Sequence, residues 1–180
     1  KFVSGMGKIA PSVKRNRDDA AVLIYSGGTT GKSKGIVLSN LCFNALAIQC
    51  IAVCPEARPG ASMMSALPIF HGFGLCVAVH APLCLGMKCI LIPKIDIKKL
   101  NETIKKTKPT IVPAVPTMLK AITNNKNLGP DSFSSVKVIL SGGDYLSDDL
   151  RARVLDYFRS CGSSTHIRIG YGLSEATAFF

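Results

Sequence analysis

The densest concentration of potential chemistry is an eleven-residue glycine-rich stretch, Tyr25-Ser-Gly-Gly-Thr-Thr-Gly-Lys-Ser-Lys-Gly35. Its glycines allow positive φ, so successive backbone N–H groups can turn toward one point and form an anion-binding nest. The serine and threonine hydroxyls add hydrogen-bond donors, and Lys32 and Lys34 add positive charge. A polyphosphate is the ligand that this composition fits. The alternative from composition alone is a solvated Gly/Ser-rich surface loop.

A P-loop NTPase is the nearest chemical alternative, because Ser26-Gly-Gly-Thr-Thr-Gly-Lys-Ser33 misses the Walker A pattern only at its first position. A Walker loop opens directly into a helix whose N-terminus faces the phosphates. Here the loop is followed by Gly35-Ile-Val-Leu38, a short run with β-branched residues that is typical of a strand. An apolar run, Ala20–Tyr25, precedes the loop and predicts a buried strand. We therefore predict a phosphate-binding hairpin loop and keep a P-loop-type NTPase as an alternative.

Three further stretches place glycines, hydroxyls or ionisable groups directly after or at the end of a predicted strand. They are Leu67-Pro-Ile-Phe-His-Gly-Phe-Gly74, Leu140-Ser-Gly-Gly-Asp-Tyr-Leu146 and Gly170-Tyr-Gly-Leu-Ser-Glu-Ala-Thr177. Together with the glycine-rich stretch, and in this order, they resemble the signature of the adenylate-forming (AMP-binding) enzymes. That superfamily includes acyl-CoA synthetases, luciferases and the adenylation domains of peptide synthetases. The matches extend from residue 25 to residue 177, nearly the whole chain.

The resemblance implies ATP-dependent activation of a carboxylic acid to an acyl-adenylate, followed by transfer to a thiol. The implied partners are a small-molecule carboxylate, ATP, and coenzyme A or another thiol acceptor, with Mg²⁺ beside the phosphates. The Gly-Gly-Thr-Thr form of the loop favours a fatty acyl-CoA synthetase within this superfamily. A non-catalytic nucleotide-binding module is the alternative from a different functional class.

The resemblance also implies roles for individual residues on the phosphate side. Charge on the β,γ-phosphates must be neutralised so that pyrophosphate can leave. The residues implied for this cradle are Ser26, Gly27, Gly28, Thr29, Thr30, Gly31 and Lys34. Glu175 is the implied Mg²⁺ ligand, since a hard cation takes a carboxylate oxygen beside phosphate oxygens. The implied catalytic set is His71, Lys34 and Glu175.

On the adenosine side, the resemblance implies that the ring of Tyr171 contacts adenine. Gly142 and Gly143 would let the base approach the backbone closely, and Gly172 follows the tyrosine. Ser174 keeps a hydroxyl for the α-phosphate. Outside the family context, Tyr171 would be interpreted as a core residue.

His71 resembles the histidine that the family places near the acyl and α-phosphate groups. Without that context a lone histidine is more often a satisfied core residue, and Ser174 with Glu175 would be interpreted as a capped helix end. His80 and His166 have no comparable surroundings in the sequence, and we predict structural roles for both.

The composition is that of a globular chain. Of its 180 residues 47% are hydrophobic, which argues against disorder. The seven cysteines form no C-x-x-C pair and no Cys/His cluster with metal-ligand spacing. Most of them lie in apolar runs, so we expect buried, reduced thiols in a cytoplasmic protein.

The net charge of +11 raises the question of nucleic acid or an anionic membrane. The basic residues are scattered, and aromatic residues do not alternate with them as a single-strand binding groove requires. We therefore expect no nucleic-acid partner, and attribute the charge to a solvated face or to contact with an acidic segment of the same enzyme. The uncharged run from Ile36 to Cys54 contains polar side chains, and we predict a buried helix there, with no transmembrane segment.

Strand and helix signals alternate along the chain and predict an α/β fold, with a mainly parallel sheet and helices on both faces. After the hairpin, the expected strands are 62–67, 87–92, 110–115, 136–140 and 166–171. The expected helices are 40–54, 72–85, 96–106, 116–124 and 147–161. Ligands of such folds gather at the carboxyl ends of strands, and we expect all four motifs to meet there in one pocket.

The resemblance further implies that this fold is part of the large domain of an adenylate-forming enzyme. We expect residues 1–19 to be a polar, basic lead-in segment and residues 20–180 to be the central portion of the AMP-binding domain. The other segments of that enzyme, including its C-terminal lid domain with a catalytic lysine, are then expected outside this sequence. The 180-residue chain alone is therefore expected to be inactive.

Overall fold

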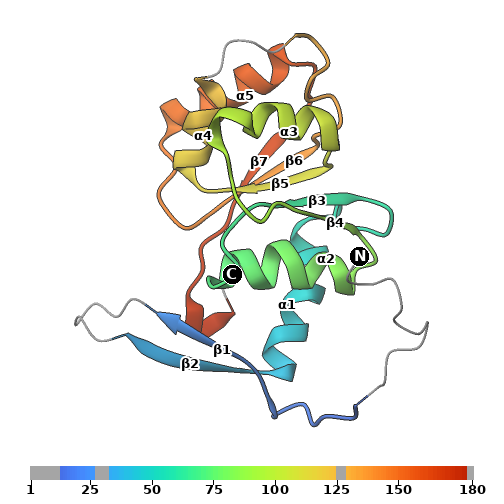
Figure 1. Cartoon of the computed structure of the whole chain (residues 1–180), viewed down its shortest axis with the longest axis vertical. Helices are drawn as coiled ribbons and strands as arrows, with labels where there is room; N and C mark the ends of the chain where they lie inside the picture. The colour runs from blue at the N-terminus through green and yellow to red at the C-terminus, as the bar shows by residue number, and fades with distance from the viewer. Residues whose placement is uncertain (1–12, 27–32, 125–128, 178–180) are drawn as a thin grey trace.

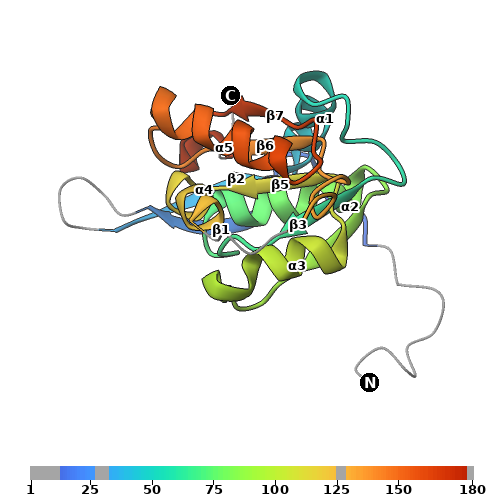
Figure 2. The ribbon, with the colours of Figure 1, turned by 90° about the horizontal axis from the view of Figure 1, so that it is seen from above.

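The computed structural model describes residues 13–26, 33–124 and 129–177 (Figure 1). Its centre is a five-stranded parallel sheet in the order β4-β3-β5-β6-β7. The strands are β3 (Ser62–Ser65), β4 (Lys88–Leu91), β5 (Ile111–Ala114), β6 (Val138–Ser141) and β7 (His166–Ile169). Figure 2 shows the order from β7 through β6 and β5 to β3. Each strand lies within the range predicted for it or extends one residue beyond it.

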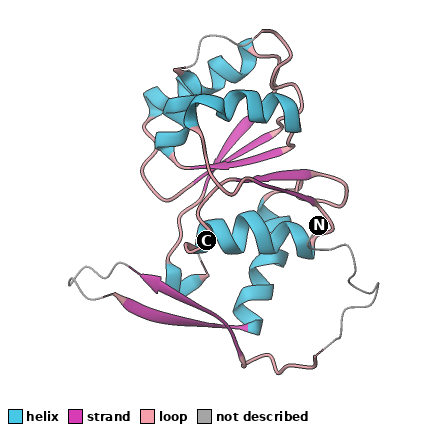
Figure 3. Cartoon of the chain, viewed as in Figure 1, coloured by secondary structure: helices cyan, strands magenta, loops and turns pink. Residues whose placement is uncertain are grey.

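Helices cover both faces of the sheet, which confirms the predicted α/β architecture (Figures 1 and 3). One face carries α3 (Leu100–Thr107), α4 (Pro116–Thr123) and α5 (Asp148–Ser160). The other carries the π-helix η1 (Phe73–His80), which continues directly into α2 (Ala81–Cys84), and then α1 (Asn40–Val53). A short 3₁₀ turn, η2 (Ile97–Lys99), leads into α3, so the helix expected from residue 96 starts in a tighter form.

Serine side chains cap both long helices, α1 and α5. The Ser39 hydroxyl accepts a hydrogen bond from the Cys42 N–H at 3.3 Å, and the Ser147 hydroxyl accepts one from the Leu150 N–H at 3.3 Å. Each satisfies a backbone donor that the first turn of a helix leaves unpaired. Between the helical layers, β5 and β6 are buried at every position, as expected for parallel strands covered on both faces.

The glycine-rich stretch is flanked by an antiparallel hairpin that is separate from the parallel sheet. β1 (Ala20–Ser26) pairs with β2 (Lys34–Ser39), with Tyr25 opposite Gly35 and Ser26 opposite Lys34. A strand on each side of the loop confirms the predicted hairpin. It also argues against the P-loop alternative, which requires a helix after the loop.

The prediction of a buried strand before the loop is wrong. Ile24 is buried, but Leu23 and Tyr25 are 54% and 65% exposed. Side chains alternate between the faces of a strand, and only one face of this hairpin packs on α1. The apolar run indicated a strand correctly, while its composition could not show that one face lacks a covering layer.

The prediction of a buried helix after β2 is also only partly right. In α1 the buried residues are Leu46, Ala47 and Cys50, whereas Ile48 is 70% exposed. Apolar side chains lie around the whole circumference of α1, and among the described residues its packing partners are η1, α2 and one face of the hairpin. Within the described ranges no helix has both the length and the apolar character that crossing a bilayer would need.

All seven cysteines are free, and four of them are buried: Cys50, Cys54, Cys76 and Cys161. Cys42 and Cys84 are exposed, so the expectation of buried thiols holds for the majority only. Burial raises the pKa of Cys50 to about 11 and that of Cys76 to about 12, because a thiolate loses hydration in the core. The buried thiols are therefore protonated and unreactive at neutral pH.

We expect iodoacetamide to alkylate the folded protein first at Cys42, with Cys50 and Cys76 protected. A pKa raised from 9.0 to about 11 leaves Cys50 with about 100-fold less thiolate than an unperturbed cysteine, before any steric protection. Peptide mass spectrometry after timed alkylation measures this, with fully denatured protein as the control in which all sites react alike. Equal alkylation rates at Cys42 and Cys50 in the folded protein would contradict the packing described for α1.

Candidate active site

The site begins where β5, β6 and β7 end, because backbone hydrogen bonds continue past the strands. The Gly142 N–H donates to the Ala114 carbonyl at 3.4 Å, and the Gly170 N–H donates to the Ser141 carbonyl at 2.8 Å. The segments that start at Gly142 and Gly170 therefore leave the sheet side by side. The chain that leaves β3 at the same edge of the sheet carries His71.

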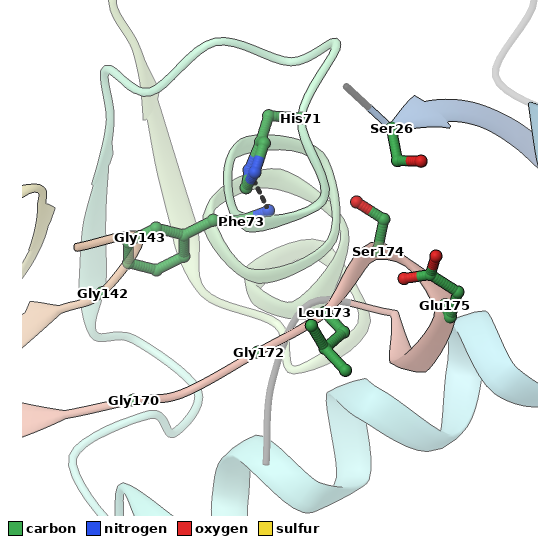
Figure 4. Close-up of a pocket in the computed structure, with 10 residues that line it drawn as sticks. All are labelled: Ser26, His71, Phe73, Gly142, Gly143, Gly170, Gly172, Leu173, Ser174 and Glu175. Atoms are coloured by element: carbon green, nitrogen blue, oxygen red, sulfur yellow. Dashed lines mark hydrogen bonds between the residues drawn. The ribbon is translucent and has the colours of Figure 1, made fainter. Parts of the chain in front are cut away.

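The hairpin reaches this edge through the short 3₁₀ turn η3 (Ser174–Ala176), which packs against both β1 and β2. Ser26 ends β1 and lies beside Ser174 and Glu175 (Figure 4). The glycine-rich motif thus follows a strand of the separate hairpin sheet, and the other three motifs follow strands of the parallel sheet. All four still meet.

Residues from all four motifs line one cavity of about 250 Å³, which we call the central cavity (Figure 4). Seven of its lining residues were predicted from the sequence: Ser26, His71, Gly142, Gly143, Gly172, Ser174 and Glu175. Three were not: Phe73, Gly170 and Leu173. The cavity combines hydroxyl groups, one imidazole, one carboxylate and exposed glycine backbone.

The imidazole of His71 has a defined hydrogen-bonding state in its neutral form. Its Nδ1 accepts a hydrogen bond from the Phe73 N–H at 3.1 Å (Figure 4). An accepting Nδ1 carries no proton, so the proton of the neutral ring is on Nε2. His71 therefore offers an N–H donor to a ligand in the central cavity.

The loop that holds His71 depends on a glycine that the sequence motif alone did not explain. The His71 N–H donates to the Pro68 carbonyl at 3.2 Å, and the following helix passes directly against this turn. A Cβ atom at Gly74 would lie 2.0 Å from the Pro68 carbonyl oxygen. Gly74 is thus required for the close approach that fixes the position of His71.

Gly142 and Gly143 each need to be glycine, for different physical reasons. A Cβ on Gly142 would lie 3.2 Å from the Gly170 carbonyl oxygen and 3.3 Å from Cε1 of Phe73. Gly143 has φ = +82°, a conformation that side-chain-bearing residues rarely adopt. The first glycine allows close packing of the strand ends, and the second turns the chain outward.

Two further hollows adjoin the central cavity. The tyrosine hollow, about 450 Å³, shares Gly143, Gly170 and Gly172 with it and is otherwise lined by Asp144, Tyr145, Leu146, Ile169 and Tyr171. The apolar hollow, about 290 Å³, shares His71, Phe73 and Gly143 with it and is otherwise lined by Leu67, Pro68, Phe70, Gly74, Val115 and Met118. Two tyrosine rings thus lie on one side of the central cavity, and phenylalanine and aliphatic side chains lie on another.

The remaining predicted residues are not brought into the cavity by the described structure. Gly27, Gly28, Thr29, Thr30 and Gly31 lie outside the described residues. Lys34 is described and lies opposite Ser26 in the hairpin, but it is exposed and does not line the central cavity. Tyr171 lies in the tyrosine hollow, 69% exposed.

The oxygen atoms that line the cavity suit a hard cation that also binds phosphate oxygens. The carboxylate of Glu175 and the hydroxyls of Ser26 and Ser174 are oxygen donors, as Mg²⁺ prefers. Among the described residues no group of three or more His, Cys, Asp and Glu side chains could hold a metal ion. Any Mg²⁺ here would therefore need phosphate oxygens or water to complete its coordination.

Comparison with known proteins agrees with this arrangement. The chain is 34% identical over 160 residues to a long-chain-fatty-acid–CoA ligase of Bacillus subtilis, covering 88% of this chain and 28% of that protein. It is 35% identical over 188 residues to 4-coumarate–CoA ligase-like 6 of Arabidopsis thaliana, covering 99% of this chain and 32% of that protein. The chain thus spans about a third of the length of these relatives.

Solved structures show the same fold. A long-chain-fatty-acid–CoA ligase from Archaeoglobus fulgidus superposes with a TM-score of 0.83 at 26% identity, covering 98% of this chain and 36% of that one. ATP-bound MatB from Rhodopseudomonas palustris superposes with a TM-score of 0.82 at 24% identity, covering 97% and 33%. The family profile described as AMP-binding enzyme matches residues 3–180. The chain therefore belongs to the AMP-binding enzyme family, the adenylate-forming superfamily that its motifs resemble.

Proposed function

We propose that the full-length gene product containing these residues is an AMP-forming carboxylate–CoA ligase. The observation that carries the proposal is that all four motifs contribute to one cavity with a hydroxyl, imidazole and carboxylate lining. Relatives named as CoA ligases support it. The chain covers only part of their length, so the activity is proposed for the longer protein, and the 180-residue chain alone is expected to be inactive.

The three adjoining spaces suit the three parts of the reacting complex. The central cavity receives the α-phosphate and the carboxylate, with the β,γ-phosphates toward Ser26 and the glycine-rich stretch, including Lys34. The tyrosine hollow receives adenine against Tyr171 and the Gly142-Gly143 backbone. The apolar hollow receives the organic part of the carboxylic acid, because its walls are aliphatic and aromatic and it opens beside His71.

In the first step a carboxylate oxygen attacks the α-phosphorus of ATP and the bond from that phosphorus to the bridging β-oxygen breaks. Acyl-adenylate and pyrophosphate result. The Nε2–H of His71 and the hydroxyl of Ser174 are the donors placed for the charge that develops on the α-phosphate oxygens. A hydrogen bond to a charged oxygen is worth about 1.5–3 kcal/mol, so two such donors account for a substantial part of the stabilisation.

Mg²⁺ fits the oxygen donors present, with Glu175 as its protein ligand. When bound, it supplies neutralisation of the phosphate charge, which makes pyrophosphate a better leaving group. In the second step the thiol of coenzyme A, as thiolate, attacks the acyl carbonyl carbon and AMP leaves. The free state of every cysteine supports a cytoplasmic location for this chemistry.

ATP–pyrophosphate exchange tests the proposed function. The full-length protein is incubated with ATP, Mg²⁺, labelled pyrophosphate and one member of a panel of aliphatic and aromatic carboxylic acids. Incorporation of label into ATP that depends on one class of acid is the expected result. Exchange that needs no acid, or hydrolysis of ATP to ADP, would support an NTPase instead.

We expect Glu175→Gln to lower kcat for adenylation about 10- to 100-fold and to raise the Mg²⁺ concentration needed for half-maximal rate. The amide keeps the size of the side chain and removes its charge. The matched control is Glu102→Gln, since Glu102 is also an exposed glutamate and lies in the first turn of α3. If Glu175→Gln unfolds the protein, or leaves the Mg²⁺ requirement unchanged, Glu175 is a structural residue.

We expect Gly74→Ala to lower kcat/KM for adenylation about 100-fold, because a displacement of roughly 1 Å in a positioning element is enough for such a loss. The added methyl would lie 2.0 Å from the Pro68 carbonyl oxygen and force the His71 loop to move. Gly129→Ala is the matched control, since a Cβ there meets nothing within 4 Å. Activity of Gly74→Ala within twofold of the wild type would show that the position of this loop does not matter.

A further inference from the structure

A buried serine, Ser65, closes the segment of chain that carries His71. It is the last residue of β3 and is 6% exposed. Its hydroxyl donates a hydrogen bond to the carbonyl of Ala78, which lies in η1, 13 residues further along the chain. His71 lies near the middle of this segment, so the hydrogen bond joins the two ends of the turn that holds it. Ser65 belongs to none of the four motifs.

Pro82 explains why the Ala78 carbonyl takes a partner outside its own helix. In an α-helix this carbonyl would accept a hydrogen bond from the N–H of residue 82, and proline has none. The proline ring also clashes with the carbonyl four residues earlier, which turns that carbonyl away from the helix. Ala78 has no exposed surface, and a buried carbonyl without a partner is costly. Ser65 therefore satisfies an acceptor that the α-helical pattern leaves unpaired.

The thiol of Cys89 in β4 lies beside the same pair. Its Sγ is 2.9 Å from the Ser65 hydroxyl oxygen and 3.6 Å from the Ala78 carbonyl oxygen. A hydroxyl has one hydrogen to donate, and here the carbonyl accepts it. The thiol is therefore the donor in its contact with Ser65. β3, β4 and η1 thus meet at one buried group of hydrogen bonds, in which Ser65 contacts both other members.

This group of hydrogen bonds lies one helical turn from the N–H that orients His71. The hydrogen bonds of a π-helix join residues five apart, so Ala78 is one turn beyond Phe73. The Phe73 N–H donates to Nδ1 of His71 at 3.1 Å, whereas the His71 backbone is held separately by the Pro68 carbonyl. A shift of η1 would therefore move the Phe73 N–H relative to the imidazole.

We propose that Ser65 is a positioning residue for adenylation, which acts through η1 on the imidazole of His71. Its hydroxyl holds Ala78, the π-turn holds Phe73, and the Phe73 N–H keeps the proton of the neutral ring on Nε2. Without the hydroxyl, η1 relaxes and His71 loses its fixed N–H donor. The effect on the reaction rate rests on the proposed function, whereas the effect on the imidazole is independent of any activity.

Nitrogen NMR of the full-length protein, labelled with ¹⁵N-histidine, tests the imidazole directly at a pH where the ring is neutral. The His71 signals are assigned by their loss in His71→Gln. In the wild type we expect Nδ1 at the chemical shift of an unprotonated nitrogen and Nε2 at that of a protonated one. Ser65→Ala should move the two shifts toward each other, because the neutral ring then populates both tautomers.

Pyrophosphate exchange measures the consequence for the reaction. We expect Ser65→Ala to lower kcat about tenfold and to change the KM for ATP less than about twofold, because it weakens a donor to charge that develops in the transition state. Ser65→Cys has nearly the same size and a weaker donor, so it should lie between the wild type and Ser65→Ala. It is kept reduced, since Cys89 is adjacent. If Ser65→Ala does not fold, Ser65→Cys takes its place in both measurements.

Ser163→Ala is the matched control. Ser163 is 5% exposed, and its hydroxyl donates to the Val136 carbonyl at 2.6 Å. Both residues precede the strands β6 and β7, at the end of the sheet opposite the site. This variant also removes a buried hydroxyl from a backbone carbonyl, but it should leave the His71 shifts unchanged and kcat within about twofold of the wild type.

The failure of this inference and the failure of the proposed function give different results. Unchanged His71 shifts in the Ser65 variants, or equal changes in Ser163→Ala, would show that Ser65 is only structural. Altered shifts with an unaltered kcat would overturn its role in the reaction. If no acid supports exchange by the wild type, the proposed function fails, and the His71 shifts still decide whether Ser65 holds the imidazole.

Discussion

The parallel pairing at the ends of β5, β6 and β7 is the constraint on which the rest of the site depends. The Gly170 N–H bonds to the Ser141 carbonyl at 2.8 Å, one residue beyond β7. This bond sets where the chain toward Tyr171, Ser174 and Glu175 leaves the sheet. Because η3 also packs on β1 and β2, the position of the hairpin follows from the same pairing. The hairpin side of the site and the tyrosine hollow are therefore fixed by one set of backbone hydrogen bonds.

Phe73 contacts both the backbone at the ends of these strands and the side chain of His71. Its N–H fixes the neutral form of His71 with the proton on Nε2, and its ring packs where Gly142 has no side chain. The ring is 6% exposed and lines both the central cavity and the apolar hollow. One residue thus orients the histidine, fills the space that the glycine leaves, and lies between the central cavity and the apolar hollow. A larger side chain at Gly142 would disturb all of these contacts together.

The sequence predicted the order and the approximate limits of the elements well, because alternating apolar runs and turn residues are local signals. It also predicted seven residues of the central cavity, since their motifs combine rare residue types. Phe73 and Tyr145 stood inside quoted motifs and were missed because only the polar neighbours suggested chemistry. Val115 and Met118 gave no signal at all, since apolar residues after a strand look like core. Burial of the hairpin and of α1 was overpredicted, because apolar composition does not show which face has a partner.

A structure of the full-length protein with ATP and Mg²⁺ tests the central claim most directly, namely that the four motifs form one nucleotide site. The account predicts the phosphates between the glycine-rich stretch and Glu175, with Mg²⁺ bound to that carboxylate. It predicts adenine in the tyrosine hollow and the α-phosphate within hydrogen-bonding distance of Ser174. A nucleotide bound away from the carboxyl ends of β6 and β7, or phosphates with no contact to η3 and the hairpin, would contradict it.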